Sequence, residues 1–71
     1  MSVEVVKVVA NGREDQVELP CTVGMFLKKY GWRPTQVVVE LNGRVLERSE
    51  VDKVALSGSD RLEVVVPVAG G

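Results

Sequence analysis

The sequence ends in two glycines, and this end is the part of the chain with the clearest chemical potential. Gly70 and Gly71 follow Pro67, Val68 and Ala69, directly after an apolar, strand-like run. Because glycine has no Cβ, an arm that ends this way passes through a channel too narrow for branched side chains. Its terminal carboxylate is ionised at pH 7, since the reference pKa of an α-carboxyl group is about 3.3–3.7. The Gly71 carboxylate is therefore the candidate reactive group.

A carboxylate carbon resists nucleophiles because its oxygens are poor leaving groups. Conversion of one oxygen into an acyl phosphate or an adenylate removes that obstacle, and a sulfur donor then displaces the activated group. The chain supplies only the acyl end, so we expect a partner enzyme to supply ATP, Mg²⁺ and the catalytic groups. Residues 67–71, fully extended, span roughly 16–18 Å at 3.3–3.6 Å each. That length reaches a deep active site while the body docks outside.

Nothing else in the sequence predicts catalysis by the chain itself. It contains no histidine, which removes Ser-His and Cys-His nucleophile pairs and the usual zinc sites. Its seven glycines match neither a phosphate-binding loop nor a dinucleotide fingerprint, so we expect no bound nucleotide. We also expect no metal site. We interpret Glu47, Glu50 and Asp52 as a solvated loop. Cys21, at a strand-to-helix junction, is expected to be a small core or boundary residue.

The composition predicts one small domain. The 71 residues are 45% hydrophobic, enough for a single core. Nine basic and ten acidic residues give a net charge of −1 without clusters, which argues against nucleic-acid binding. One cysteine suits a reducing compartment. No stretch resembles a secretion signal or a membrane span, so we expect a cytoplasmic protein without membrane contact.

The first part of the chain predicts a β-hairpin. Residues 3–10 and 16–19 are strand candidates, joined by an Asn11-Gly12 turn and a loop over residues 13–15. Polar residues in the first strand differ in parity, which indicates either a bulge or partial cover on both faces. Pro20 ends the second strand, because proline cannot donate to a ladder.

A short helix follows, with Thr22 as its N-cap. Val23, Phe26, Leu27 and Tyr30 fall at i, i+3, i+4 and i+7 and so share one face. Gly31 is the natural residue just past its end.

The remaining sequence predicts three more strands, at residues 37–41, 44–46 and 61–66, with a second turn at Asn42-Gly43. Residues 47–53 are polar and expected to be irregular, with at most one helical turn. The element order is thus ββαβββ. A single helix must bury its apolar stripe on a sheet, so the fold class is a two-layer α+β domain over residues 1–66, with residues 67–71 as a flexible tail.

One sheet face is expected to stay uncovered, since a single helix covers only the other. We predict that the last strand runs inside the sheet and that apolar side chains near the tail dock a partner. The docking candidates are Leu62, Val64, Val65 and Val66.

Short motifs across nearly the whole chain give it a family resemblance. They occur in the family's order and spacing at Asn11-Gly12, Thr22-Val23, Phe26-Leu27 and residues 39–43, 45–50, 60–64 and 70–71. In these the chain resembles the ThiS-like sulfur carriers of the ubiquitin-like β-grasp family. The glycine usual before the Asp60 position is Ser59 here, with Gly58 one place earlier.

The resemblance implies a β-grasp fold, with a mixed sheet of four to five strands on one helix, and a carrier function. It implies that an E1-like enzyme of the ThiF/MoeB kind adenylates the Gly71 carboxylate. A sulfur donor, such as a cysteine desulfurase or sulfide, then converts it to a thiocarboxylate. ThiS-like carriers deliver that sulfur to a thiazole synthase in thiamine biosynthesis. ATP and Mg²⁺ belong to the activating enzyme.

Three alternatives stay open from the sequence. The arm also looks like the ending of the molybdopterin synthase small subunit, so the sulfur could serve molybdopterin or tRNA thiolation. The chain could instead be a ubiquitin-like modifier joined to lysine through Gly71. The last alternative is a plain binding module.

Overall fold

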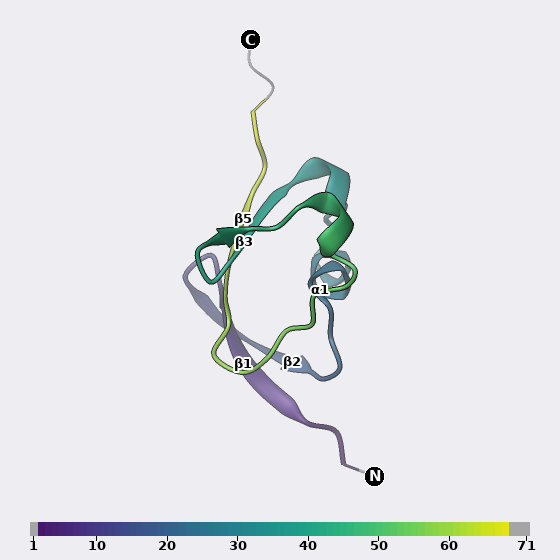
Figure 1. Ribbon diagram of the computed structural model, residues 1–71. Coiled ribbons are helices and arrows are strands. Elements are labelled where there is room, and N and C mark those ends of the chain that lie inside the picture. The colour runs from purple at the N-terminus through teal and green to yellow at the C-terminus, as the bar shows by residue number, and fades with distance from the viewer. Residues whose placement is uncertain (1, 69–71) are drawn as a thin grey trace.

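The computed structural model describes residues 2–68 as one sheet with a helix packed on it (Figure 1). Its elements are β1 (Val5–Ala10), β2 (Arg13–Glu18), α1 (Val23–Lys29), β3 (Val38–Leu41), β4 (Arg44–Val45) and β5 (Arg61–Val65), with single 3₁₀ turns at Pro34–Gln36 and Arg48–Glu50. The predicted order ββαβββ and the α+β class are confirmed. No helix in this part of the chain has the length and apolar character needed to cross a membrane.

The five strands lie in the order β2-β1-β5-β3-β4, so the last strand of the chain is the central one. β5 runs parallel to β1 and antiparallel to β3, while β1–β2 and β3–β4 are antiparallel hairpins. The sheet is therefore mixed, as expected. Figure 1 shows that β5 leads straight into the C-terminal arm, away from the N-terminus.

Both hairpins turn on an Asn-Gly pair in the left-handed region. Asn11 and Gly12 have φ angles of 51° and 80°, and Asn42 and Gly43 have 52° and 85°. Such turns match the twist of the flanking strands and reverse the chain within two residues. Pairing accordingly resumes at once, and Arg13 lies opposite Ala10. The loop predicted for residues 13–15 was therefore wrong, because those residues already belong to β2.

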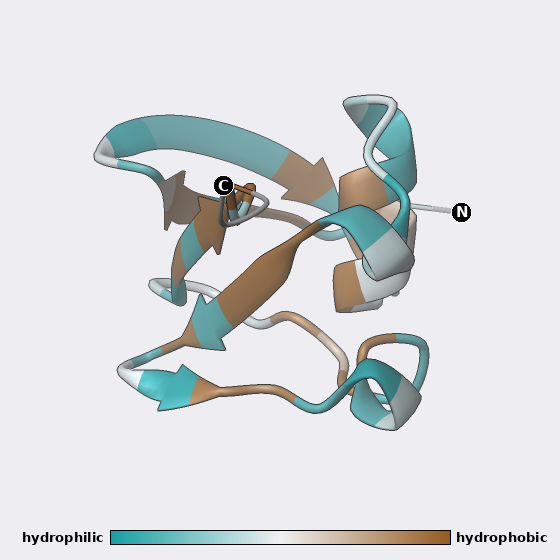
Figure 2. Ribbon diagram, turned by 90° about the horizontal axis from the view of Figure 1, so that it is seen from above, coloured by the Kyte–Doolittle hydropathy of each residue, from teal (hydrophilic) through white to brown (hydrophobic). Residues whose placement is uncertain are grey.

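The helix forms where the sequence predicts it. The Thr22 side-chain Oγ1 accepts a hydrogen bond of 3.1 Å from the backbone N–H of Met25, which satisfies one free donor of the first turn. Gly31, with φ 79°, follows the last turn. The helical face of Val23, Phe26 and Leu27 is buried against the sheet. Figure 2 shows this hydrophobic part of the helix on the side that faces the strands.

The connection between β4 and β5 contributes more to the core than its polar composition predicts. Leu46, Val51 and Leu56 are all buried. The carbonyl of Val51 also accepts a hydrogen bond of 2.7 Å from the backbone N–H of Gly24 in the first turn of α1. The connection therefore closes the end of the core beside the helix. The complete buried cluster is Val8, Val17, Cys21, Val23, Phe26, Leu27, Val39, Leu46, Val51, Leu56, Leu62 and Val64.

Strand β1 decides between the two alternatives that the sequence left open. Its residues pair one to one with β2 along its whole length, so it contains no bulge. Val8 is fully buried on the helix side, whereas Val5, on the other side, is 51% exposed. The polar residues Glu4 and Lys7 differ in parity because Glu4 lies before the strand, which begins at Val5. The face opposite the helix is partly covered, since Val9 is half-buried there.

Candidate functional site

The arm leaves the body at the end of the central strand. β5 ends at Val65, one residue before the predicted end, and residues 66–68 continue outside any strand. Val66 is 58% exposed and Val68 is 91% exposed. Pro67 is also exposed. The other predicted tail residues, Ala69, Gly70 and the reactive Gly71, lie outside the described residues.

Asn11 binds the backbone of β5 close to this exit. Its Nδ2 donates a hydrogen bond of 3.2 Å to the carbonyl of Val64, and its Oδ1 accepts one of 2.7 Å from the N–H of the same residue. The two groups are 53 positions apart in the chain. One side-chain amide thus occupies both hydrogen-bonding groups of Val64 on that edge of the strand.

Asn42 holds the opposite end of the same strand. Its Oδ1 accepts a hydrogen bond of 2.9 Å from the N–H of Arg61, and its Nδ2 donates one of 2.9 Å to the Asp60 carboxylate. The other Asp60 oxygen accepts a hydrogen bond of 2.8 Å from the N–H of Ser57. Both hairpin turns therefore fasten β5 through their asparagine side chains.

The docking prediction is corrected at two of its four residues. Leu62 is 1% exposed and Val64 is 7% exposed, because their side chains point to the helix side and fill the core. They cannot present a free surface to a partner. Val65 and Val66 are 54% and 58% exposed and remain candidates.

The sheet face opposite α1 carries a cluster of exposed valines near the arm. Val65 lies directly across from Val38, which is 41% exposed. Next along the same two strands, Glu40 lies across from Glu63, and β4 adds the exposed Val45 opposite Glu40. We call Val38, Val45 and Val65 the arm patch; Val66, which lies beyond the strand end, is the first residue of the arm. Valine favours strand structure, but a cluster of exposed valines beside the arm is also typical of a partner site.

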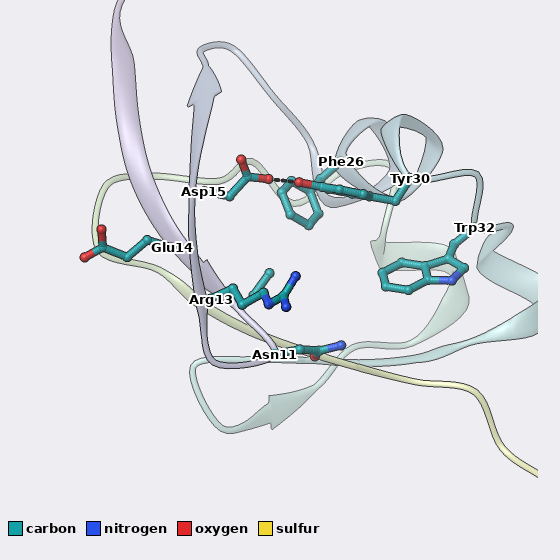
Figure 3. Close-up of a pocket in the computed structure, with 8 residues that line it drawn as sticks. Asn11, Arg13, Glu14, Asp15, Phe26, Tyr30 and Trp32 are labelled. Carbon is teal, nitrogen blue, oxygen red and sulfur yellow. Dashed lines mark hydrogen bonds between the residues drawn. The ribbon is translucent and has the colours of Figure 1, made fainter.

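A separate hollow of about 310 Å³ lies between the β1–β2 turn and the C-terminal end of α1 (Figure 3). Aromatic rings form one side of it: the centroids of Phe26 and Tyr30 are 5.1 Å apart, and those of Tyr30 and Trp32 are 6.0 Å apart. Figure 3 shows the Arg13 side chain between these rings and Asn11.

Asp15, one of the charged residues that line the hollow, is bound by other groups of the chain. The Tyr30 hydroxyl donates a hydrogen bond to the Asp15 carboxylate, and the Lys29 Nζ lies 3.7 Å from the same group. The hydrogen bond from Tyr30 is the main cause that lowers the pKa of Asp15, and the same bond raises the pKa of Tyr30. These contacts fasten the end of α1 to β2, and we assign the hollow no chemical step.

The remaining chemical candidates are also structural. The Cys21 side chain is buried, and burial raises its thiol pKa, which disfavours the reactive thiolate. Glu50 accepts hydrogen bonds from the N–H of Glu47, at 2.7 Å, and from Arg44, at 3.2 Å, and these lower its pKa. Within residues 2–68, no three acidic, cysteine or histidine side chains gather closely enough to hold a metal ion.

The Asn-Gly pairs predict both turns, but they do not predict what the asparagine side chains bind. Turn chemistry explains Asn11 and Asn42 fully, since asparagine tolerates a positive φ angle. Their second role depends on β5 lying between the two hairpins, and only the strand order reveals that.

Comparison with known proteins identifies the group to which this architecture belongs. The family model described as "ThiS family" matches residues 3–71. The crystal structure of a thiamine biosynthesis protein (ThiS) from Geobacter metallireducens superposes with a TM-score of 0.79 at 29% identity, covering 93% of this chain and all of that one. An NMR structure from the same organism gives a TM-score of 0.74 at 29% identity, covering 93% and 88% of the two chains.

One curated relative differs in size. A thiazole synthase of Paramagnetospirillum magneticum is 34% identical over 65 residues, which are 92% of this chain and 20% of that protein. The chain therefore spans about a fifth of the length of that relative.

Proposed function

The chain belongs to the ThiS family, and from this membership and the geometry of the arm we propose that it carries sulfur for thiamine biosynthesis on the carboxylate of Gly71. The observation that supports this best is the origin of the arm. It continues from the central strand, held at both ends, into exposed residues 66–68. A rigid body with a narrow, exposed arm suits a substrate that other enzymes modify. In this role the chain is a carrier and not a catalyst.

The proposed chemistry proceeds in two steps. A carboxylate oxygen of Gly71 attacks the α-phosphate of ATP, so that an acyl adenylate forms and pyrophosphate leaves. Hydrosulfide, supplied directly or released from a donor such as a cysteine desulfurase persulfide by a thiol reductant, then attacks the acyl carbon. With hydrosulfide, the C–S bond forms as the C–O bond to AMP breaks, and the products are thiocarboxylate, AMP and a proton. An E1-like enzyme of the ThiF/MoeB kind holds ATP and Mg²⁺ and supplies the catalytic groups.

The sulfur acceptor is a thiazole synthase-like enzyme. Support comes from the curated relative, since a protein named thiazole synthase contains a segment similar to almost the whole of this chain. When a carrier sequence and a synthase sequence are joined in one protein, the two parts act in the same pathway. Direct transfer from the thiocarboxylate to the synthase is the simplest such relationship.

The arm patch is the proposed docking surface for the activating enzyme. A partner has to bind the body, because a few tail residues alone do not specify which enzyme receives them. Val65 lies directly beside the arm, and Val38 extends the apolar area on the neighbouring strand. A partner on this patch receives the arm from the adjacent strand end without distortion of the body.

The experiment is ATP-dependent loading followed by intact-mass analysis. The full chain is incubated with ATP, Mg²⁺, sulfide and a thiamine-pathway adenylating enzyme, and the thiocarboxylate appears as the replacement of one oxygen by sulfur. Deletion of Gly71, or addition of one residue after it, is expected to abolish loading while the circular dichroism spectrum stays unchanged. An extended chain that still gains sulfur would refute the proposal. A mass increase on target lysines instead would identify a protein modifier.

A further inference from the structure

The side chain of Asn11 continues the β1–β5 ladder after β1 has ended. Along β5, the carbonyl of Asp60 accepts from the N–H of Val9 and that of Leu62 from the N–H of Asn11, both at 2.9 Å. The next carbonyl in this series, that of Val64, accepts from Asn11 Nδ2 at 3.2 Å. The backbone of β1 cannot supply this donor, because the chain turns at Asn11 and Gly12. The side-chain amide takes the place of the missing peptide group.

The side-chain amide therefore moves the last hydrogen bond on that edge of β5 two residues closer to the arm, from Leu62 to Val64. On the other edge, the last residue pair of β5 is Val65 with Val38. With Asn11 in place, both edges of β5 are held up to the point where Val66 emerges, 58% exposed. Without it, the strand end would be held on the β3 side alone.

We infer that Asn11 is a positioning residue that fixes the point and the direction in which the arm leaves the body. The inference rests on the proposed function, because the arm has to enter a partner's active site while the arm patch is docked. When both edges of the strand end are held, the arm leaves the body in the same direction each time a partner binds. When only one edge of the strand end is held, the arm leaves in several directions, and the partner has to order it at a cost in backbone entropy.

The chain contains a matched control in Asn42. It occupies the same position of the second turn, with nearly the same φ angle, and it binds the same strand through Arg61 at the end far from the arm. Asn11→Gly and Asn42→Gly both keep the turn, since glycine accepts a positive φ angle. Each variant removes one side-chain amide that is hydrogen-bonded to β5. They differ in which end of the strand is released.

The first measurement needs no partner. In ¹⁵N relaxation of the full chain, Asn11→Gly is expected to lower the heteronuclear NOE of the Val65 and Val66 amides, whereas Asn42→Gly leaves both at wild-type values. Equal NOE values at these two amides in Asn11→Gly and the wild type would overturn the inference. The result is independent of what the arm carries.

The second measurement is the kinetics of loading by the activating enzyme with ATP and sulfide. Asn11→Gly is expected to lower kcat on the order of tenfold, as for ordering one further residue, with KM for the carrier changed by less than about twofold. KM is expected to stay unchanged because the arm patch, which binds the activating enzyme, is intact. Asn42→Gly is expected to stay close to wild type in both. If the two variants load alike, or if Asn11→Gly changes KM and not kcat, the positioning role is refuted.

Asn11→Asp keeps the test decisive if the glycine variant folds poorly. Aspartate tolerates the same backbone conformation and retains the oxygen that accepts from the Val64 N–H, but it lacks the donor to the carbonyl. An intermediate kcat is expected, and a wild-type kcat would overturn the role of the amide. Failure of the wild-type chain itself to load would contradict the proposed function, while the relaxation result would still decide whether Asn11 holds the arm.

Discussion

The hydroxyl of Tyr30 donates a hydrogen bond to the carboxylate of Asp15, which joins the end of the only α-helix among the described residues to the second strand. Lys29 lies near the same carboxylate and 5.5 Å from the centre of the Tyr30 ring. The sequence predicts a helix for the part that holds Tyr30 and a loop for the part that holds Asp15. Their contact exists because residues 13–15 are strand and run past the helix end.

This contact predicts a pH dependence with two limbs. The pKa of Asp15 is lowered by folding, so its contribution is present above its ordinary pKa of 3.8 and is lost as pH falls through the folded value. The pKa of Tyr30 is raised above 10.0, so its contribution is present below pH 10 and is lost as pH rises through the folded value. The stability difference between wild type and Tyr30→Phe is therefore expected to be constant near neutrality and to shrink at both extremes.

Urea denaturation across pH measures that difference. Lys29→Ala is the comparison variant, because it removes a positive charge beside Asp15 and should shift the acid limb while the Tyr30–Asp15 hydrogen bond remains. A difference between wild type and Tyr30→Phe that does not change with pH would contradict the assignment.

Phe26 should dominate the stability of the core. Its side chain is 1% exposed between helix and sheet, so Phe26→Ala is expected to cost about 3–5 kcal/mol. A domain of this length holds on the order of 5–10 kcal/mol in total. The variant should therefore be barely folded, as seen by its denaturation midpoint. Lys28→Ala, on the exposed side of the helix, should lie within about 0.5 kcal/mol of wild type.

Ser59 has φ 71°, a conformation that an L-residue adopts at a cost of roughly 1–2 kcal/mol. The greater freedom of glycine in the unfolded chain offsets part of the relief. We expect Ser59→Gly to stabilise the domain by about 0.5–1 kcal/mol. Ser57→Gly should do the opposite, because it removes the Ser57 hydroxyl that lies 3.3 Å from the Asp60 carboxylate. Chemical denaturation of the pair tests whether the backbone angle at position 59 matters.

The buried thiol should take no part in sulfur loading. Burial raises the pKa of Cys21, so at neutral pH it is almost entirely protonated. Cys21→Ser is expected to gain sulfur from sulfide at the wild-type rate, and the native wild type should react with iodoacetamide only slowly. A large loss of loading in Cys21→Ser would mean that the thiol relays sulfur.

The arm patch predicts a binding defect without a folding defect. Val65 is 54% exposed, and a lysine at its position would lie on the same face as Glu63. Val65→Lys is therefore expected to weaken binding to the activating enzyme severalfold with little change in thermal midpoint. Met25→Lys, 55% exposed on the helix side, is the matched control and should bind normally. Equal affinities of the two variants, measured by calorimetry, would move the docking surface elsewhere.

Local signals predicted most of the fold. The Asn-Gly turns, the Thr22 cap and the 3.6-residue spacing of Val23, Phe26 and Leu27 each act within a few residues, so the sequence displays them directly. The family resemblance, carried by short motifs, added the carrier function, and the family match agrees with it.

Apart from the loop predicted at residues 13–15, the errors were long-range. Leu62 and Val64 alternate onto one face of the last strand, but the face that the helix covers depends on strand order, and both are core residues. In the same way, the buried Val51 sits in a polar stretch, and only the packing of that stretch against α1 explains it.

The position of β5 also bears on how the protein is made. Residues 5–10 emerge from the ribosome early, yet their parallel neighbour, residues 61–65, comes some fifty positions later. Until that strand arrives, the two hairpins have no common partner and the sheet lacks its centre. Folding should therefore follow synthesis of almost the whole domain, with the slow kinetics of distant pairing. A chain cut short before β5 would lack the core residues Leu62 and Val64 and the whole arm, so it would offer no end for activation.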